Sequence, residues 1–337
     1  MRILLIGFGA VGQGLTQILR DQADYLRERE GFEARIVGVA TRSRGTLYHP
    51  GGFDLDALLD VAGDGRFDRF PQLDGLLRDQ DIFDLIRMAD ADVLVEVSHS
   101  NLQTAQPALD YCRAALDSGK HVVMANKGPV ALAYDDLMNH AQRVGKQVGF
   151  EATVMAGTPS LRLGMDALAG CRIESARGIL NGTTNYILTQ MEVGMAYSDA
   201  LEQAQALGYA EADPTADVDG WDAASKVVIL AAALFGQRLS LDSMPVAGIS
   251  SLTLADIEAA RAAGERWKLI GTATPDGARV EPVRLPANHP LAQVSGATNA
   301  ITYTTDLLGD VTLVGPGAGP VATGFGLLAD LLAIHRT

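Results

Sequence analysis

The spacing of hydrophobic residues differs between the two halves of the chain. In the first half, short apolar runs that predict strands alternate with segments whose apolar residues recur at helical spacing. The predicted strands cover residues 3–6, 35–40, 92–97, 121–124 and 148–153, and the predicted helices cover residues 11–29, 104–117 and 134–144. This alternation is typical of an α/β fold of the Rossmann type, with a doubly wound parallel sheet. Residues 41–84 are irregular and rich in Gly and Asp, and we expect them to leave the sheet.

The second half mixes helical spacing with strand-like runs. Helices are predicted at residues 160–168, 184–193, 198–207 and 223–234, and a last apolar helix runs to Ile334. A Pro-Asp-Gly turn inside the stretch 270–285 predicts a hairpin, and further strands are expected at 301–305 and 311–314. We therefore expect two domains: residues 1–150, completed by residues 306–337, and an α+β substrate and dimerisation domain of residues 151–305.

Composition and charge narrow the class of protein. The 337 residues include 27 Lys and Arg against 41 Asp and Glu, a net charge of −14, which argues against binding to nucleic acid or to an anionic membrane surface. The longest apolar run, 227–235, is too short for a bilayer, which needs about 20 residues. Glycines interrupt the N-terminal strand, so no signal peptide is expected. Two cysteines, Cys112 and Cys171, make a disulfide framework implausible and fit a cytoplasmic protein.

A glycine-rich turn separates the first predicted strand from the first helix. Its residues are Gly7, Phe8, Gly9, Ala10, Val11 and Gly12. In this context the glycines permit a tight turn, a close approach of the backbone to a pyrophosphate and close packing of helix on strand. The motif predicts a dinucleotide site, and an ordinary tight turn is the alternative. The second strand ends in Thr41, Arg42 and Arg44 without a carboxylate, which favours NADP over NAD; two solvated arginines are the alternative there.

Three later segments resemble one enzyme family. They are Ala125-Asn126-Lys127, the run GILNGTTNYIL at 178–188, and the series A-x3-G-Y-A-x2-D-P-x2-D-V-x-G-x-D-x3-K at 204–226. The series resembles the signature of homoserine dehydrogenases, and the likeness extends over nearly the whole chain. It implies the reversible NAD(P)-linked interconversion of L-homoserine and L-aspartate 4-semialdehyde in threonine and methionine biosynthesis. It also implies a substrate domain built on a mixed sheet and a homodimer formed through that domain. The chain corresponds to a short form without the C-terminal ACT domain, so we expect little feedback by threonine.

Two lysines are the candidate catalytic residues. Lys226 follows Asp222 by four residues, which places both on one face of a helix, and the family's proton donor falls on Lys226. Spacing alone favours an exposed salt bridge between the two, and the surrounding series reverses that preference. Lys127 ends a strand at the edge where ligands bind in open α/β sheets, and the resemblance makes it a second functional lysine near the nicotinamide; a surface lysine is the alternative.

The resemblance extends to substrate, cofactor and cation ligands. A positive ammonium on the substrate suits carboxylates, and its carboxylate suits the N–H groups of a helix start. The substrate residues implied are Glu211, Asp217, Asp222, Gly182, Thr183 and Tyr209. The cofactor residues added by the resemblance are Ser98, Lys127 and Gly317. A turn at 151–159 resembles the family's site for a monovalent cation such as sodium, held by carbonyl oxygens of Glu151, Val154, Ala156 and Thr158; a simple interdomain turn is the alternative.

Two other functions compete with this assignment. A different Rossmann dehydrogenase would have to account for the whole series at 204–226. A non-catalytic, NADP-sensing protein that kept the fold would not need Lys127 and Lys226, and both are present.

Overall fold

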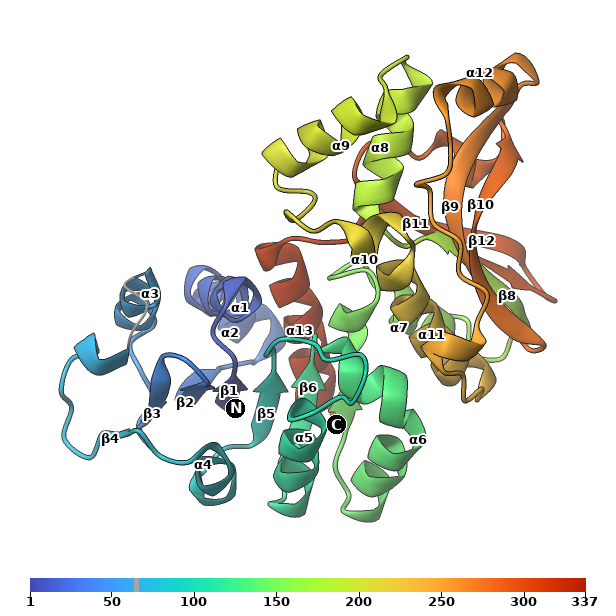
Figure 1. Ribbon diagram of the computed structural model, residues 1–337. Coiled ribbons are helices and arrows are strands. Elements are labelled where there is room, and N and C mark those ends of the chain that lie inside the picture. Colours follow the sequence, from blue (N-terminus) through green and yellow to red (C-terminus); the bar gives the residue numbers. More distant parts are fainter. Residues whose placement is uncertain (64–66) are drawn as a thin grey trace. The chain divides into compact units, whose positions relative to one another are not determined.

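A seven-stranded sheet lies at the centre of the first unit of the protein, which comprises residues 1–157 and 319–337 (Figure 1). The computed structural model describes residues 1–63 and 67–337. The sheet has the strand order β4-β3-β2-β1-β5-β6-β7. Its strands are β1 (Arg2–Ile6), β2 (Arg35–Thr41), β3 (Gly45–Tyr48), β4 (Leu77–Arg78), β5 (Val93–Glu96), β6 (His121–Met124) and β7 (Val148–Gly149).

Five of these strands form the expected parallel sheet, and the other two correct the prediction. In the series β2-β1-β5-β6-β7 each strand is parallel to the next, whereas β3 pairs antiparallel with β2, and β4 antiparallel with β3. The expectation that residues 41–84 leave the sheet is therefore wrong for both short strands. A tight turn folds the chain back: the Thr41 hydroxyl accepts the Arg44 N–H at 2.9 Å and donates to the Gly45 carbonyl at 3.2 Å.

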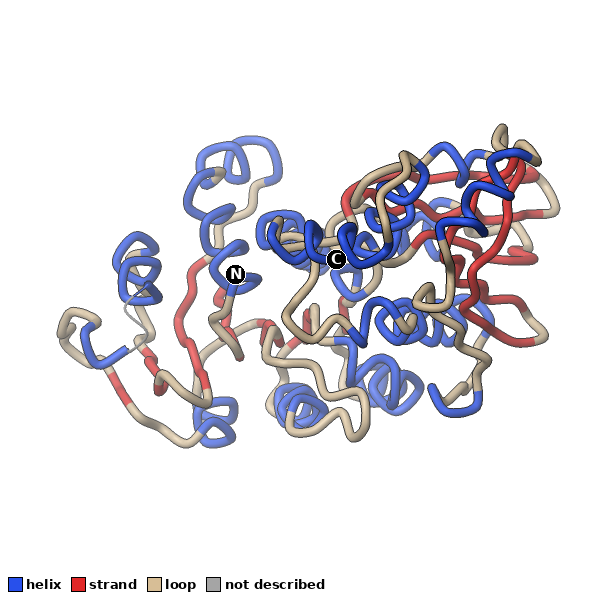
Figure 2. Tube along the Cα trace, turned by 45° about the horizontal axis from the view of Figure 1, so that its top comes forward, coloured by secondary structure: helices blue, strands red, loops and turns tan. Residues whose placement is uncertain are grey.

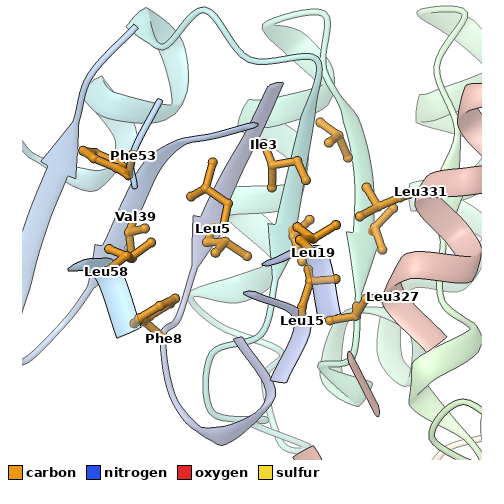
Figure 3. Packing of buried hydrophobic residues seen from close by; sticks show 14 of the residues in the cluster. Ile3, Leu5, Phe8, Leu15, Leu19, Val39, Phe53, Leu58, Leu327 and Leu331 are labelled. Atoms are coloured by element: carbon orange, nitrogen blue, oxygen red, sulfur yellow. The ribbon is translucent and has the colours of Figure 1, made fainter. Parts of the chain in front are cut away.

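Helices cover both faces of this sheet (Figure 1). They are α1 (Ala10–Asp21), α2 (Ala23–Glu30), α3 (Leu55–Gly63), η1 (Phe67–Arg69), α4 (Ile82–Met88), α5 (Ala108–Asp117), α6 (Lys127–Arg143), η2 (Glu151–Thr153) and α13 (Pro320–His335). Leu15 of α1, Leu58 of α3 and Leu327 of α13 share one core with Leu5 of β1 (Figure 3). α13 packs closely on α1 because each helix places a glycine against the backbone of the other. A Cβ on Gly14 of α1 would collide with the Pro320 carbonyl of α13.

Several predicted element ends differ from the observed ones. The helix expected at 11–29 is divided at Gln22, and the one expected at 104–117 begins only at Ala108. The helix expected at 134–144 already begins at Lys127, because the Asn126 side chain caps it through the Gly128 N–H at 3.0 Å. The strand expected at 148–153 ends at Gly149. The next segment turns into η2, where the Glu151 N–H donates to the Asp330 carboxylate of α13 at 2.9 Å.

The second unit, residues 158–318, contains a five-stranded sheet of order β10-β9-β8-β11-β12, whose long strands are red in Figure 2. Its strands are β8 (Ile173–Ile179), β9 (Glu265–Thr274), β10 (Gly277–Pro286), β11 (Thr298–Thr305) and β12 (Gly309–Pro316). All four strand pairs are antiparallel, so the expected mixed sheet is corrected to an antiparallel one. The helices are α7 (Ser160–Arg162), η3 (Leu163–Ala167), α8 (Gly182–Glu192), α9 (Tyr197–Ala206), α10 (Thr215–Val218), α11 (Trp221–Phe235), η4 (Leu241–Ser243), α12 (Leu254–Ala262) and η5 (Pro290–Gln293).

The boundaries of the two units differ from the predicted ones at 150 and 305. Residues 306–318 belong to the second unit, because β12 pairs with β11 along its whole length. Residues 151–157 stay with the first unit, where Glu151 bonds to α13 and Gly157 packs against the Ala322 carbonyl. Among the described residues, none of the helices combines the length and the hydropathy required to cross a bilayer.

Candidate active site

The glycine-rich turn between β1 and α1 leaves an open approach to the helix. Gly7 has a φ of +99°, and a Cβ there would lie 2.6 Å from the Val97 carbonyl carbon, so this position requires glycine. A Cβ on Gly9, the N-cap of α1, would meet nothing within 4 Å. The first amides of α1 are therefore accessible to a pyrophosphate, whose negative charge the helix dipole favours. This cradle fits a dinucleotide.

A cavity of about 330 Å³ lies beside this turn, at the carboxyl ends of β1, β2 and β5. Its lining residues are Ile6, Gly7, Phe8, Gly9, Ala40, Thr41, Arg42, Ser43, Arg44, Ile82, Val97, Ser98, His99, Pro107 and Tyr111. Seven of the predicted cofactor residues are in this lining: Gly7, Phe8, Gly9, Thr41, Arg42, Arg44 and Ser98. Sequence reasoning missed Ile82, Pro107 and Tyr111, which give the cavity an apolar wall suited to a flat base. Their only sequence signal is their place near the starts of α4 and α5.

The cavity lining contains two arginines. Among the described residues that line it, none carries a carboxylate. Arg42 is exposed, and the Arg44 guanidinium donates from Nη1 to the Phe8 carbonyl at 2.9 Å, so it is folded onto the turn. Arg44 thus has a structural contact of its own, which leaves Arg42 as the more available partner for a phosphate.

The remaining predicted cofactor residues lie outside this lining. Ala10 lines a second cavity with Gln13, Gln17 and residues 319–322. Val11 and Gly12 form the first turn of α1 behind it. Lys127 is the first residue of α6 and is half-buried. Gly317 belongs to the second unit, where its backbone lies against the Asn299 side chain.

The loops after β5 and β6 are joined by a buried carboxyl group. Glu96, the last residue of β5, accepts the Ser98 N–H at 2.7 Å and the Asn126 amide at 3.4 Å on Oε1, and the Ser98 hydroxyl at 3.3 Å on Oε2. Burial raises the pKa of Glu96 to about 7, and the hydrogen bonds from Ser98 and Asn126 oppose this shift. The Lys127 N–H donates to the Ser100 hydroxyl at 3.2 Å, so both loops are fixed at their polar ends.

In the second unit, the predicted catalytic pair forms a buried ion pair. Lys226 Nζ lies 2.7 Å from Asp222 Oδ2 and donates to the Leu180 carbonyl at 2.6 Å. The Lys226 side chain is 9% exposed and the Asp222 side chain 20%, because nearly every residue of α11 around them is buried. The alternative of an exposed salt bridge is therefore excluded. A buried ammonium held by one carboxylate and one carbonyl has a fixed direction, which suits it to proton transfer.

Asn181 connects this pair to the start of α8. Its Nδ2 donates to Asp217 Oδ1 at 2.7 Å and to Asp222 Oδ2 at 3.0 Å, and its Oδ1 accepts the Thr184 N–H at 2.9 Å as the helix cap. Sequence reasoning gave this residue no role, although Asn before Gly-Thr-Thr is a recognisable capping pattern. It holds two acidic side chains that are distant in sequence next to the buried lysine.

The predicted substrate residues fall into two groups. Gly182 and Thr183 begin α8, and the Thr183 hydroxyl donates to the Tyr209 carbonyl at 2.5 Å, so these three residues meet near Asp217 and Asp222. Glu211 differs from them, because its side chain is exposed. Its backbone carbonyl accepts a hydrogen bond from the Gln205 side chain at 3.0 Å. The structure therefore assembles the aspartates and the helix start more closely than the glutamate.

The predicted cation turn is buried and tightly folded. Glu151 begins η2, Ala156 has a φ of +52°, and the Thr158 carbonyl accepts the Ser160 N–H at 2.6 Å. Among the described residues, no group of three or more His, Cys, Asp or Glu side chains is arranged to hold a metal ion. A cation here would depend on backbone carbonyls, including that of Val154, which are hard donors of the kind alkali ions take.

Comparison with known proteins gives a consistent result. The model of the homoserine dehydrogenase family matches residues 159–332, and that of the homoserine dehydrogenase NAD-binding domain matches residues 7–151. The NAD(+)-dependent homoserine dehydrogenase of Pseudomonas canavaninivorans is 44% identical over 100% of this chain and 96% of its own length, and the homoserine dehydrogenase of Methanocaldococcus jannaschii is 40% identical over 100% and 99%. The solved structure of a hyperthermophilic archaeal homoserine dehydrogenase in complex with NADPH is 30% identical, with a TM-score of 0.83 over 99% of this chain and 97% of that one.

Proposed function

The chain belongs to the homoserine dehydrogenase family, and we propose that Lys226, held by Asp222, carries the proton of its reaction. The activity is the reversible NAD(P)H-dependent reduction of L-aspartate 4-semialdehyde to L-homoserine, an oxidoreductase reaction at a CH–OH group. The observation that supports the proposed centre is the buried ion pair, whose ammonium is fixed by Asp222 and by the Leu180 carbonyl.

In the reduction, the aldehyde carbon gains a hydride and its oxygen gains a proton. A dihydronicotinamide held at the glycine-rich turn would supply this hydride. Lys226 donates a proton from Nζ to the oxygen as negative charge develops there, and Asp222 stabilises the ammonium form until that point. In the oxidation, the neutral amine of Lys226 removes the proton from the hydroxyl group. Lys127 has the proposed role of positioning and electrostatic stabilisation near the nicotinamide, and direct proton transfer is the less favoured alternative.

The substrate's two charged groups have separate proposed partners. Asp217, with Glu211 and Asp222, balances the ammonium, and the N–H groups of Gly182 and Thr183 bind the carboxylate at the start of α8, an 11-residue helix. Tyr209 lines the same place. The test is oxidation of L-homoserine against 4-hydroxybutanoate, which lacks the ammonium. We expect NADP⁺ reduction with L-homoserine and little with the analogue; tight NADP⁺ binding with no turnover of either would support the non-catalytic sensor instead.

We further propose that NADP is preferred over NAD. Arg42 beside a cavity lining without carboxylates supports this, as does the NADPH complex of one relative, whereas another relative is named for NAD(+). Replacing Arg42 by alanine should lower the ratio of kcat/KM for NADPH to that for NADH by about tenfold or more, because a charge-assisted hydrogen bond is lost. Arg87→Ala, on the exposed face of α4, is the matched control. An unchanged ratio in the Arg42 variant would remove the argument for NADP.

A monovalent cation, with sodium as the first candidate, is proposed at the turn containing Glu151, Val154, Ala156 and Thr158. A ligand that binds only the folded state raises its stability, by about 2.7 kcal/mol at a concentration one hundred times its Kd. We therefore expect the melting temperature to rise with sodium but not with tetramethylammonium at equal ionic strength. Equal melting curves in the two salts would show a turn without a bound ion.

The proposed assembly is a homodimer formed through the second unit, acting on a small-molecule substrate without nucleic-acid or membrane partners. Leu307, Leu308 and Val314 expose apolar side chains at β12 and the turn before it, which supports an interface there. A cytoplasmic location is proposed because Cys112 and Cys171 are free thiols, as is usual for proteins of a reducing compartment.

A further inference from the structure

The strongest feature that the reaction does not use is Glu96, a carboxyl group with 0% exposure at the carboxyl end of β5. Its register neighbours are Ile6 on β1 and Met124 on β6, both apolar. Burying an acid in such surroundings is costly unless hydrogen bonds offset the loss of water. Within the described residues, the Glu96 carboxyl oxygens accept hydrogen bonds from Ser98 and Asn126. The group thus binds two loops that follow adjacent parallel strands.

Each of these loops belongs to the cofactor edge of the sheet. Ser98 lines the cavity, and its backbone nitrogen lies 2.7 Å from the place a Cβ on Gly7 would occupy, so it packs directly against the glycine-rich turn. Asn126 is the cap of α6, and the next residue is Lys127. A movement of the Glu96 carboxyl group would therefore shift both the Ser98 loop and the N-terminus of α6.

We propose that Glu96 is a positioning residue of the cofactor site, which fixes the Ser98 loop against the glycine-rich turn and fixes the Asn126 cap that orients Lys127. The inference rests on the proposed cofactor roles of Ser98 and Lys127. Binding energy depends on such fixed geometry, and a misplacement of about 1 Å at a reacting group can cost about a hundredfold in rate.

A pair of substitutions separates the geometry from the charge. Glu96→Gln keeps an oxygen for the Ser98 N–H and the Asn126 amide, and its amide nitrogen faces the Ser98 hydroxyl, which can turn to accept. We expect its Kd for NADPH, measured by the fluorescence of the bound dinucleotide, to stay within about threefold of the parent. Glu96→Ala removes the hydrogen bonds to both Ser98 and Asn126, and its Kd should rise by about tenfold or more. Equal affinities of the alanine variant and the parent would overturn the proposal, as would equal losses in both variants.

A third variant tests the connection toward Lys127. Asn126→Ala leaves the bonds between Glu96 and Ser98 but removes the cap of α6 and the bonds from Asn126 to the Ser98 and His99 carbonyls, so kcat should fall by a larger factor than the Kd for NADPH rises. This variant also tests the proposal if Glu96→Ala does not fold, because an unchanged kcat would contradict the claim that the Asn126 cap orients Lys127. Asp92→Asn, just before the other end of β5, is the control for loss of a carboxylate and should bind NADPH as the parent does.

The binding measurements use the whole protein without amino-acid substrate, and kcat is measured with L-homoserine present. If the parent itself fails to bind NADPH, the cofactor assignment fails. If the parent binds and the two Glu96 variants do not differ, only the positioning role fails. Melting temperatures of all variants show whether a change in affinity merely follows a loss of folded protein.

Discussion

Replacing Lys226 by methionine should lower kcat by about 10²- to 10⁴-fold in both directions of the reaction, the range expected for loss of a general acid. Methionine keeps most of the buried stem and removes only the ammonium, so the structure of α11 should persist. The loss should be larger in kcat than in the affinity for NADPH, because the residues that line the cofactor cavity lie on the first unit. The measurement is steady-state kinetics with L-homoserine and with L-aspartate 4-semialdehyde, alongside a melting curve.

Lys268 provides a matched control for this experiment. It is a second buried lysine of the same unit, whose Nζ donates to the Val294 carbonyl at 2.9 Å and to Asn185 Oδ1 at 3.2 Å. Burial lowers the pKa of Lys268. Lys268→Met should reduce stability but retain kcat in the protein that remains folded. If the two variants lose kcat equally at equal stability, the loss reflects the removal of any buried lysine, and Lys226 is not the proton donor.

Replacing Gly9 by valine should raise the Kd for NADPH by about a hundredfold or more while leaving the free protein intact. A Cβ at this position meets nothing within 4 Å, and the observed φ of −77° is one that any L-residue adopts, so the folded chain tolerates the change. The added methyl groups instead occupy the approach to the amides of α1, where the pyrophosphate binds. Fluorescence titration with NADPH measures the effect.

Gly7 makes the contrasting control within the same turn. Its φ of +99° and the 2.6 Å approach to Val97 mean that Gly7→Ala should lower the melting temperature even without cofactor. A Gly9 variant that binds NADPH normally would show that the pyrophosphate does not use this turn. A Gly9 variant that melts early would show that the position is needed for folding and would leave the binding argument without support.

Local patterns allowed the best predictions, because their meaning depends on neighbours in sequence. The strand–glycine–helix pattern predicted the turn that lines the cavity. The spacing of Asp222 and Lys226 predicted that both lie on one helix face. The burial that separates a catalytic pair from a surface salt bridge comes from the packing of all of α11, which spacing does not contain. The resemblance supplied that preference where the pattern alone did not.

The misses come from contacts between residues far apart in sequence. Asn181 joins Asp217 and Asp222, 36 and 41 positions away, and no local signal links the three. The Glu151–Asp330 bond, which ends the sheet at Gly149 and keeps the following turn in the first unit, spans 179 positions. The boundary expected at 305 differs for another reason: β12 forms a short hairpin with the preceding β11 and so stays in the second unit, and only the helix after it belongs to the first unit.

The most direct test of the account follows the hydrogen atom itself. The protein is incubated with NADPH carrying deuterium on the transferable position of the nicotinamide and with L-aspartate 4-semialdehyde, and the product is analysed by mass spectrometry. We expect L-homoserine with one deuterium on the carbon that was the aldehyde, formed by the parent and almost absent with Lys226→Met. Unconsumed NADPH in the presence of the aldehyde and folded parent protein, or homoserine without the label, would contradict it.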